Sequence, residues 1–260
     1  MNNKEIAFLV GSVMNPSIGT FTTHEGHRSH QSREERARQT VLSLNSIFCN
    51  HPNAKVFLID SSLDLTDQQV QEWCHPGGIY NFLQNHNIEI IKLCDIDRDV
   101  CIKINTHINK SYCEALIYDK FLEHYESKLA DYDHIIKISG RYSLTHNCKD
   151  ILINKNQVSF KSFIEFPNPN KFAWVNPVIK MDHQELWEMK WTPSFLFIFG
   201  GEMISELKNF FKFTIEVTEN SSINIEDAIQ YWLWKNKINN IPLDWKALAY
   251  TGRDSTLWYF

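Results

Sequence analysis

A serine, a glycine and an arginine stand together where an apolar run near the middle of the chain ends. Residues 134–139 (HIIKIS) predict a buried strand, so Ser139, Gly140 and Arg141 lie at its carboxyl end. Glycine lets a ligand approach the backbone closely, and the planar guanidinium of arginine can hold two phosphate oxygens at once. The segment predicts a site where Arg141 stabilises negative charge on a bound ligand. A surface salt bridge and a simple turn are the structural alternatives.

Two adjacent carboxylates are candidates for the removal of a proton. Glu226 and Asp227 occupy the first turn of a helix predicted over residues 225–236. Transfer of a group to a hydroxyl with inversion needs a carboxylate that deprotonates the hydroxyl. We predict Asp227 as this base, with Glu226 beside it. Acidic residues in a first helical turn also complement the helix dipole, and a retaining enzyme would need neither residue in that role.

Acidic triplets raise the question of a metal ion. Asp95 and Asp97 follow a strand predicted over residues 88–94 and could reach the same edge of the sheet as Arg141. Two routes to a neutralised diphosphate therefore stay open. One is a divalent cation, Mn²⁺ or Mg²⁺, on the oxygens of Asp95 and Asp97. The other is a metal-independent site in which Arg141, Lys110 and Arg253 supply the positive charge.

Further candidates for donor binding lie at strand ends and helix starts. In open α/β sheets ligands bind at the carboxyl ends of the strands, and exposed amides at a helix start suit an anion. An acidic residue at the end of the second strand could accept hydrogen bonds from a ribose or a base, or simply begin the next loop. The residues at such positions are Gly11, Ser12, Arg36, Asp60, Ser61, Asn109 and Lys110.

The elements that must position these residues alternate between strand and helix in the first half of the chain. The hydrophobic period changes from two to 3.6 and back several times, which predicts a mainly parallel sheet flanked by helices on both faces. After residue 143 the pattern becomes irregular and rich in aromatic residues. We predict one α/β domain over residues 1–260. The expected strands are 5–13, 55–60, 88–94, 134–139, 157–166 and 194–200, and the expected helices begin near residues 33, 109, 202 and 225.

Bulk composition excludes several classes of partner. The net charge of -5 gives no overall basic field for nucleic acid. The six cysteines show no CxxC pair, which favours free thiols in a reducing cytoplasm over a disulfide framework or a zinc site. No apolar run approaches the roughly 20 residues of a membrane span. We expect a cytoplasmic protein, with peripheral contact at the inner face of a membrane left open.

The order of these motifs resembles the GT-A glycosyltransferases. A strand, a capped helix, a strand ending in IDSS, a third strand, a helix opening with NKS and a strand ending in SGRY correspond to their nucleotide-sugar donor half, over about residues 1–142. SFLFIFGG, followed by a helix and then Glu226-Asp227, resembles their acceptor half, over about residues 143–260. The family usually carries Asp-x-Asp where this chain has Ser139-Gly140-Arg141-Tyr142.

The resemblance implies transfer of a sugar from a nucleotide-sugar donor to a hydroxyl of a glycan or glycolipid acceptor. Bacterial enzymes of this size often build surface polysaccharide or lipooligosaccharide. Other enzyme classes lack their markers, since the chain has neither the G-x-G-x-x-G of dinucleotide oxidoreductases nor a P-loop. The altered triplet leaves one alternative open: a catalytically inactive protein that keeps the fold and binds a nucleotide or a glycan.

Overall fold

A six-stranded sheet forms the centre of the molecule. The structure is a computed structural model that describes residues 5–13, 33–68, 86–145, 148–161, 193–220, 223–250 and 257–259. The strand order is β3-β2-β1-β4-β7-β6. The first four strands of this order are parallel, β7 runs antiparallel to β4, and β6 runs antiparallel to β7. Their bounds are β1 Ile6–Ser12, β2 Lys55–Asp60, β3 Ile88–Lys92, β4 His134–Ser139, β6 Val158–Phe160 and β7 Leu196–Gly200.

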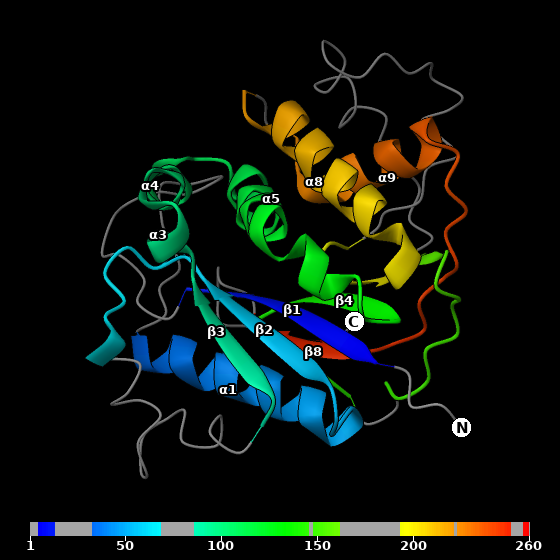
Figure 1. Cartoon of the computed structure of the whole chain (residues 1–260), viewed down its shortest axis with the longest axis horizontal. Coiled ribbons are helices and arrows are strands. Elements are labelled where there is room, and N and C mark those ends of the chain that lie inside the picture. The colour runs from blue at the N-terminus through cyan, green and yellow to red at the C-terminus, as the bar shows by residue number, and fades with distance from the viewer. Residues whose placement is uncertain are drawn as a thin grey trace.

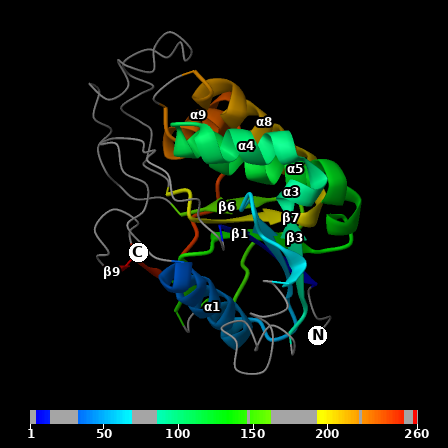
Figure 2. The same cartoon turned by 90° about the vertical axis from the view of Figure 1, so that its left-hand side faces the viewer.

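Helices cover both faces of this sheet and complete a three-layer arrangement (Figures 1 and 2). Among the described helices, α1 (Arg33–Asn50) is the one that covers one face in these views. On the other face lie α5 (Lys110–Leu129), α8 (Ile204–Thr218) and α9 (Ile225–Lys235). The predicted α/β fold with a mainly parallel sheet is confirmed.

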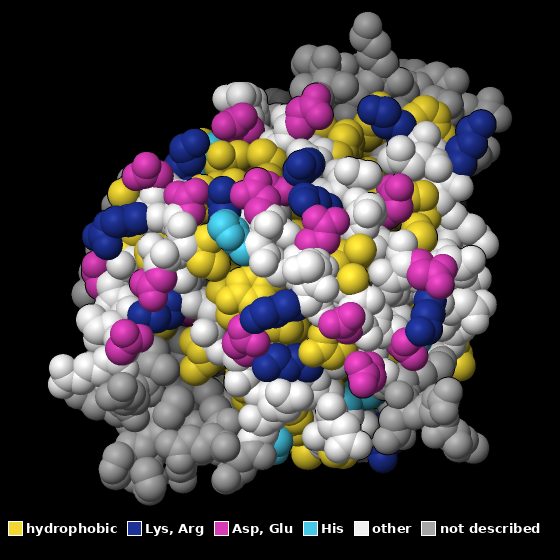
Figure 3. All heavy atoms as spheres, in the orientation of Figure 1, with side chains coloured by type: hydrophobic (Ala, Val, Ile, Leu, Met, Phe, Trp, Pro, Cys, Tyr) yellow, Lys and Arg dark blue, Asp and Glu magenta, His cyan; other side chains and the backbone are white. Residues whose placement is uncertain are grey.

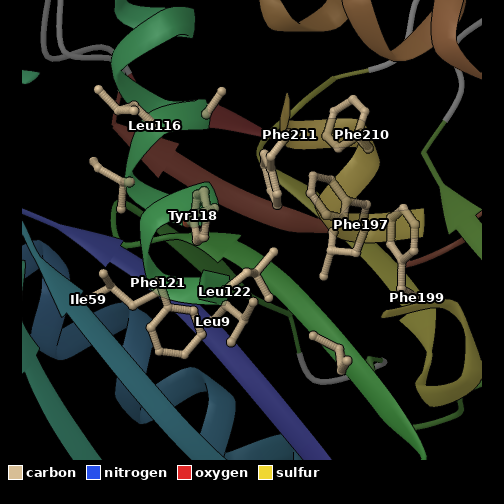
Figure 4. Packing of buried hydrophobic residues seen from close by; sticks show 14 of the residues in the cluster. Leu9, Ile59, Leu116, Tyr118, Phe121, Leu122, Phe197, Phe199, Phe210 and Phe211 are labelled. Atoms are coloured by element: carbon tan, nitrogen blue, oxygen red, sulfur yellow. The ribbon is translucent and has the colours of Figure 1, made fainter. Parts of the chain in front are cut away.

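Two hydrophobic clusters hold the layers together, one on each side of the sheet. The cluster beneath α5 and α8 is rich in aromatic rings, and Figure 4 shows Tyr118 and Phe211 facing each other beside Phe197 and Phe210. Their ring centroids are 5.0 Å apart for Tyr118 and Phe211 and 5.9 Å for Phe197 and Phe210. The second cluster packs α1 against the opposite face. Alternating apolar side chains of the buried strands supply both clusters.

The structure departs from the sequence-based prediction in two places beside the sheet. The strand predicted over 88–94 ends at Lys92, because Leu93–Ile96 form a short helix, α3. Helix α4 (Arg98–Thr106), which the sequence did not predict, follows directly. Asp97 makes α4 possible, since its side chain accepts a hydrogen bond from the Val100 amide at the helix start. This cap is hard to recognise in the sequence, because Asp97 lies among the other charged residues of the segment 95–99.

A second, three-stranded sheet was also missed. It has the order β5-β8-β9 and consists of Tyr142–Leu144, Ala247–Tyr250 and Leu257–Tyr259. Strands of three or four residues are too short to show a period of two in the sequence. The sheet begins directly after Gly140-Arg141, so it continues the chain away from the end of β4.

Three expectations concern segments that lie partly or wholly outside the described residues. Ser32, the predicted cap of α1, and Arg253 are not described, and neither is the predicted strand beyond residue 161. The five cysteines that the structure describes are free thiols. In the described ranges, no helix combines the length and the apolar character that crossing a membrane would require.

Candidate active site

The carboxyl ends of three adjacent parallel strands are level with one another. Ser12 of β1 is paired with Asp60 of β2, and Gly11 is paired with Ser139 of β4. Neighbouring strands lie about 4.8 Å apart, so these residues form one continuous edge of the sheet. The amide of Gly140 donates to the carbonyl oxygen of Gly11 over 3.1 Å and extends this edge by one residue. The structure thus assembles the strand ends that the sequence predicted as donor-binding.

Both glycines at this edge are required by close packing. A Cβ at residue 11 would lie 2.7 Å from the hydroxyl oxygen of Tyr118, and one at residue 140 would lie 2.8 Å from the carbonyl oxygen of Gly11. Neither contact leaves room for a larger side chain. The sequence explained Gly140 by access for a ligand, whereas the structure gives a reason internal to the fold.

The polar side chains at the ends of β1 and β2 are largely turned inward. Ser12 lies 3.5 Å from the hydroxyl of Thr40 on α1, and Asp60 accepts a hydrogen bond of 2.9 Å from the Ser62 amide. The carbonyl oxygen of Ser61 accepts a bond of 2.8 Å from Asn105. Asp60 is 1% exposed. It stabilises the turn after β2, which is the structural alternative considered for it, and a nucleoside contact remains a prediction.

Arg36 and Arg141 come from two different elements and interact electrostatically. Arg36 lies in the first turn of α1, and Arg141 follows β4. Burial and, secondly, the charge of Arg141 lower the pKa of Arg36 from 12.5 to about 9. The Nε atom of Arg36 is buried without a hydrogen-bond partner. Within the described ranges, no carboxylate lies within ion-pair distance of either guanidinium. Two cations that repel each other beside an uncompensated buried N–H form a site suited to an anion.

Asn109 and Lys110 open helix α5 as predicted. The side-chain oxygen of Asn109 accepts bonds from the amides of Ser111 and Tyr112, at 2.9 and 3.5 Å. Its side-chain nitrogen donates to the carbonyl oxygens of Thr218 and Ile223. Asn109 therefore ties α5 to the segment between α8 and α9, while Lys110 is exposed.

Asp95 and Asp97 each have a partner that accounts for their position. Asp95 in α3 forms an ion pair of 2.6 Å with Lys92, and Asp97 caps α4 and lies 3.2 Å from the ammonium of Lys120. Within the described residues, no three His, Cys, Asp or Glu side chains come together as a metal site would need. The surrounding face carries interspersed charges of both signs (Figure 3). A metal on Asp95 and Asp97 stays a prediction, for which this part of the chain offers no third ligand.

The two predicted carboxylates at the start of α9 have different surroundings. Asn224 caps the helix by accepting from the Asp227 amide over 2.8 Å, and Asp227 itself is 8% exposed. Glu226 is more exposed and accepts a hydrogen bond of 2.7 Å from the hydroxyl of Ser194. Burial raises the pKa of Glu226, and the bond from Ser194 opposes this rise. Glu226 joins a wider polar network through Ser194.

Lys137 is the centre of that network, and the sequence did not single it out. Its side chain is fully buried on β4 and forms an ion pair with Glu114 of α5. It also donates to the hydroxyl of Ser139 over 3.1 Å and to the carbonyl oxygen of Ser194 over 2.5 Å. A signal was present, because a lysine in the middle of the apolar run HIIKIS must find partners when the strand is buried.

Tyr142 connects the network with the arginines. Its ring stacks on Phe195 with centroids 4.4 Å apart. Burial raises the pKa of Tyr142, Arg141 lowers it, and Glu114 and Glu226 raise it further. Arg141, Glu114 and Glu226 are therefore all near the phenol ring of Tyr142.

The glycines of SFLFIFGG lie away from the carboxyl end of β4. Strand β7 is antiparallel to β4, so Gly200 is paired with His134 at the opposite edge of the sheet. A Cβ at residue 200 would lie 2.1 Å from the Lys155 carbonyl oxygen, and one at residue 201 would lie 2.0 Å from that of Tyr132. The beginning of β7, with Ser194 and Phe195 just before it, is the part that reaches the site.

Comparison with known proteins identifies the fold. No protein-family model matches the chain, and no curated protein matches it in sequence. Among solved structures, the bifunctional glycosyltransferase WbbM in its apo form matches 94% of this chain with a TM-score of 0.50 at 12% identity. The fold is GT-A-like. This chain spans 40% of the length of WbbM.

Two further matches are weaker. The galactosyltransferase LgtC, solved with donor and acceptor sugar analogues, matches 86% of this chain and 69% of its own at 11% identity, with a TM-score of 0.45. Mouse xyloside xylosyltransferase 1 matches 93% of this chain and 85% of its own at 8% identity, with a TM-score of 0.44. Both are too distant to bear on chemistry. In the GT-A-like fold of this chain, Ser139-Gly140-Arg141 ends β4, and it contains no carboxylate.

Proposed function

We propose that this protein is a glycosyltransferase that moves a sugar from a nucleotide-sugar donor to a hydroxyl of a glycan or glycolipid acceptor. The observation that carries the proposal is the arginine pair at the carboxyl edge of a GT-A-like sheet. Arg36 and Arg141 lie close enough to lower the pKa of Arg36, and no described carboxylate neutralises them. A diphosphate between them would remove this repulsion.

The chemistry follows from where the charge develops. When the bond between the sugar and the diphosphate breaks, the leaving nucleoside diphosphate gains negative charge. Two guanidinium groups that are already in place stabilise that charge without reorganisation, and each can hold two phosphate oxygens. Arg36 was predicted as a donor-binding residue, and the proposal now gives it the same task as Arg141. Lys110 and Arg253 remain candidates for further phosphate contacts.

We favour the metal-independent route over Mn²⁺ or Mg²⁺ on Asp95 and Asp97. The reason is the partners of these carboxylates, since Asp97 serves as a helix cap and Asp95 pairs with Lys92. If a metal is bound there, it would supply positive charge to the diphosphate, and both aspartates would have to leave their present partners. The proposal extends to bacterial surface polysaccharide or lipooligosaccharide as the product and to a cytoplasmic setting at the inner face of the membrane.

The test is release of nucleoside diphosphate from a panel of nucleotide sugars, with glycan acceptors present, in EDTA and in Mn²⁺. We expect release from one donor that survives EDTA. Arg36→Ala and Arg141→Ala should each lower the rate by about 10²-fold or more, the loss typical of removing one charge-stabilising donor. The matched control is Arg38→Ala, an exposed arginine on the same helix that should keep the wild-type rate.

Two results would contradict the proposal in different ways. Release that requires Mn²⁺ and is unaffected by both arginine variants would assign the diphosphate to a metal site. Tight nucleotide binding without release from any donor would favour the catalytically inactive binding protein.

A further inference from the structure

A buried lysine links three elements of the site through one hydrogen-bonded network. The ammonium of Lys137 has three N–H donors, and each meets an acceptor: the Glu114 carboxylate, the Ser139 hydroxyl and the Ser194 carbonyl oxygen. These acceptors belong to α5, to the end of β4 and to the segment before β7. The lysine side chain is 0% exposed. A charge buried this deeply is stable only while all its partners stay in place.

Ser194 extends the network to α9. Its carbonyl oxygen accepts from Lys137 over 2.5 Å, and its hydroxyl donates to Glu226 over 2.7 Å. The five groups Lys137, Glu114, Ser139, Ser194 and Glu226 are called the lysine network below. Glu226 lies in the first turn of α9, and it keeps part of its surface exposed, as Glu114 also does. It can therefore meet a substrate while the other members hold it.

The lysine network ends where the arginine pair begins. Ser139 accepts from Lys137, and Arg141 follows two residues later. The charges of Glu114 and Glu226 reach Tyr142, whose pKa also responds to Arg141. The carboxylates of Glu114 and Glu226 and the guanidinium of Arg141 thus all lie close enough to Tyr142 to act on the pKa of its phenol.

We propose that Glu226 takes the proton from the acceptor hydroxyl, and that Lys137 and Glu114 are positioning residues that set the charge of Glu226. This inference rests on the proposed transfer function. In the step, the acceptor oxygen forms a bond to the anomeric carbon while the bond from that carbon to the diphosphate oxygen breaks. The diphosphate leaves with the electron pair toward Arg36 and Arg141, and the hydroxyl proton moves to the Glu226 carboxylate. A single displacement of this kind inverts the anomeric carbon.

The neighbours of Glu226 act on its ionisation in opposite directions. Ser194 faces it from the segment before β7, Glu114 from α5, Lys137 from β4 and Tyr142 from β5. The Glu114 charge raises the pKa of Glu226 and the Lys137 charge lowers it. A base must be unprotonated to act. The pH at which kcat/KM falls on the acid side of the profile, called the acid limb below, should therefore shift when a charge near Glu226 is removed.

The test compares pH profiles of kcat/KM for sugar transfer. Glu114→Gln should move the acid limb to lower pH, and Lys137→Met should move it to higher pH. Glu226→Gln should lower the rate by about 10²-fold to 10⁴-fold. The matched control is Glu216→Gln, an exposed glutamate on α8, which should leave the profile unchanged. If the lysine network had a purely structural role, Glu114→Gln and Lys137→Met would lower the rates, but their acid limbs would stay at the same pH.

A second measurement keeps the inference testable if a variant folds poorly. NMR of protein labelled with ¹³C at the carboxyl carbons follows the titration of Glu226 directly. The signal that is missing in Glu226→Gln identifies the Glu226 resonance. Thermal unfolding shows whether Lys137→Met folds. If it does not, the double variant Lys137→Met/Glu114→Gln removes both charges of the pair, and its limb should lie between those of the single variants.

Several results would overturn the inference. They are a Glu226→Gln protein that retains transfer, acid limbs that move in the same direction in both variants, and loss of transfer in Asp227→Asn alone, which would assign the base to Asp227. A product that retains the configuration of the anomeric carbon would also overturn the inference. Failure of the wild-type protein to transfer from any donor is distinct, because it would overturn the proposed function before any variant is compared.

Discussion

The amide of Gly11 donates a hydrogen bond of 3.0 Å to the hydroxyl of Tyr118, which lies 107 residues further along the chain. This bond joins the end of β1 to the middle of α5. Tyr118 is 1% exposed, and its ring stacks on Phe211 of α8. The end of the strand that borders the arginine pair is therefore supported by a fixed phenol, which in turn requires glycine at residue 11.

Replacement of Gly11 by alanine should destabilise the fold. The new Cβ would come within 2.7 Å of the Tyr118 hydroxyl oxygen, so either the ring or the strand must move. We expect a loss of about 1–3 kcal/mol in the free energy of unfolding. Urea unfolding of Gly11→Ala, Tyr118→Phe and the double variant measures it. The double variant should be more stable than the sum of the single losses implies, because the clashing oxygen is gone. Additive losses would show that the two residues do not interact.

Removal of the Arg36 charge should stabilise the protein without ligand. Burial and Arg141 lower the pKa of Arg36 to about 9, which means that the fold disfavours its charged form. This cost is fully present below about pH 9 and decreases as the pH rises toward the ordinary value of 12.5. At neutral pH, Arg36→Met should therefore gain about 1–3 kcal/mol, or several degrees in Tm.

The same variant should lose its response to anions. Inorganic pyrophosphate stabilises a protein whose native state binds it, so the wild-type Tm should rise with pyrophosphate concentration while that of Arg36→Met stays constant. Arg38→Met, at an exposed position of α1, serves as the control and should respond as the wild type does. A pyrophosphate response that persists in Arg36→Met would place the anion elsewhere.

Asp97 should tolerate asparagine better than alanine. Its side chain caps α4, and asparagine is an equally good cap, whereas alanine typically costs about 1 kcal/mol. The Val100 amide and, to a lesser extent, Lys120 lower the pKa of Asp97 below 3.8. The carboxylate therefore contributes stability above that pH and loses it as the pH falls through the lowered pKa. Thermal unfolding at neutral pH and in acid measures both effects. A Mn²⁺-dependent activity abolished by Asp97→Asn would show a metal ligand instead.

Gly201 should not accept a side chain. A Cβ there would lie 2.0 Å from the Tyr132 carbonyl oxygen, and the Gly201 amide donates to the Asp133 carbonyl oxygen over 2.8 Å. Backbone atoms cannot rotate away as a side chain can, so we expect Gly201→Ala to lose about 3 kcal/mol or more. Exposed Asp131→Ala is the control and should change stability by less than about 0.5 kcal/mol. Equal unfolding midpoints for the two variants would contradict the predicted clash.

Much of the fold follows from local patterns. The apolar runs that became β1, β2 and β4 are buried on both faces, and such runs are readable without knowledge of their neighbours. Asn109 was correctly predicted to cap α5, because a cap depends on residues within one turn. Helix α4 and the small sheet were missed, since a charged segment and strands of three or four residues carry a weak periodic signal.

The candidate site was predicted in part. The sequence placed Arg141, Gly140 and Ser139 at a strand end and expected ligands there, and the sheet brings that end level with Asp60 and Ser12. It did not show that β7 runs antiparallel to β4, which puts Gly200-Gly201 at the opposite edge of the sheet from Arg141. The direction of a strand depends on how the chain returns to the sheet, and no residue within the strand records it.

The sequence by itself determined which segments are buried and where helices begin, because burial and capping depend on residue types a few positions apart. Only the tertiary structure decided that the charge of Arg141 acts on Arg36 and that Lys137 meets Glu114 and Ser194. These residues come from separate elements, and their encounter requires the sheet to close first. When the sheet has closed, the low dielectric of the interior makes the energy of each of these charges depend on the groups around it. That dependence is the basis of the anion site proposed at this edge of the sheet.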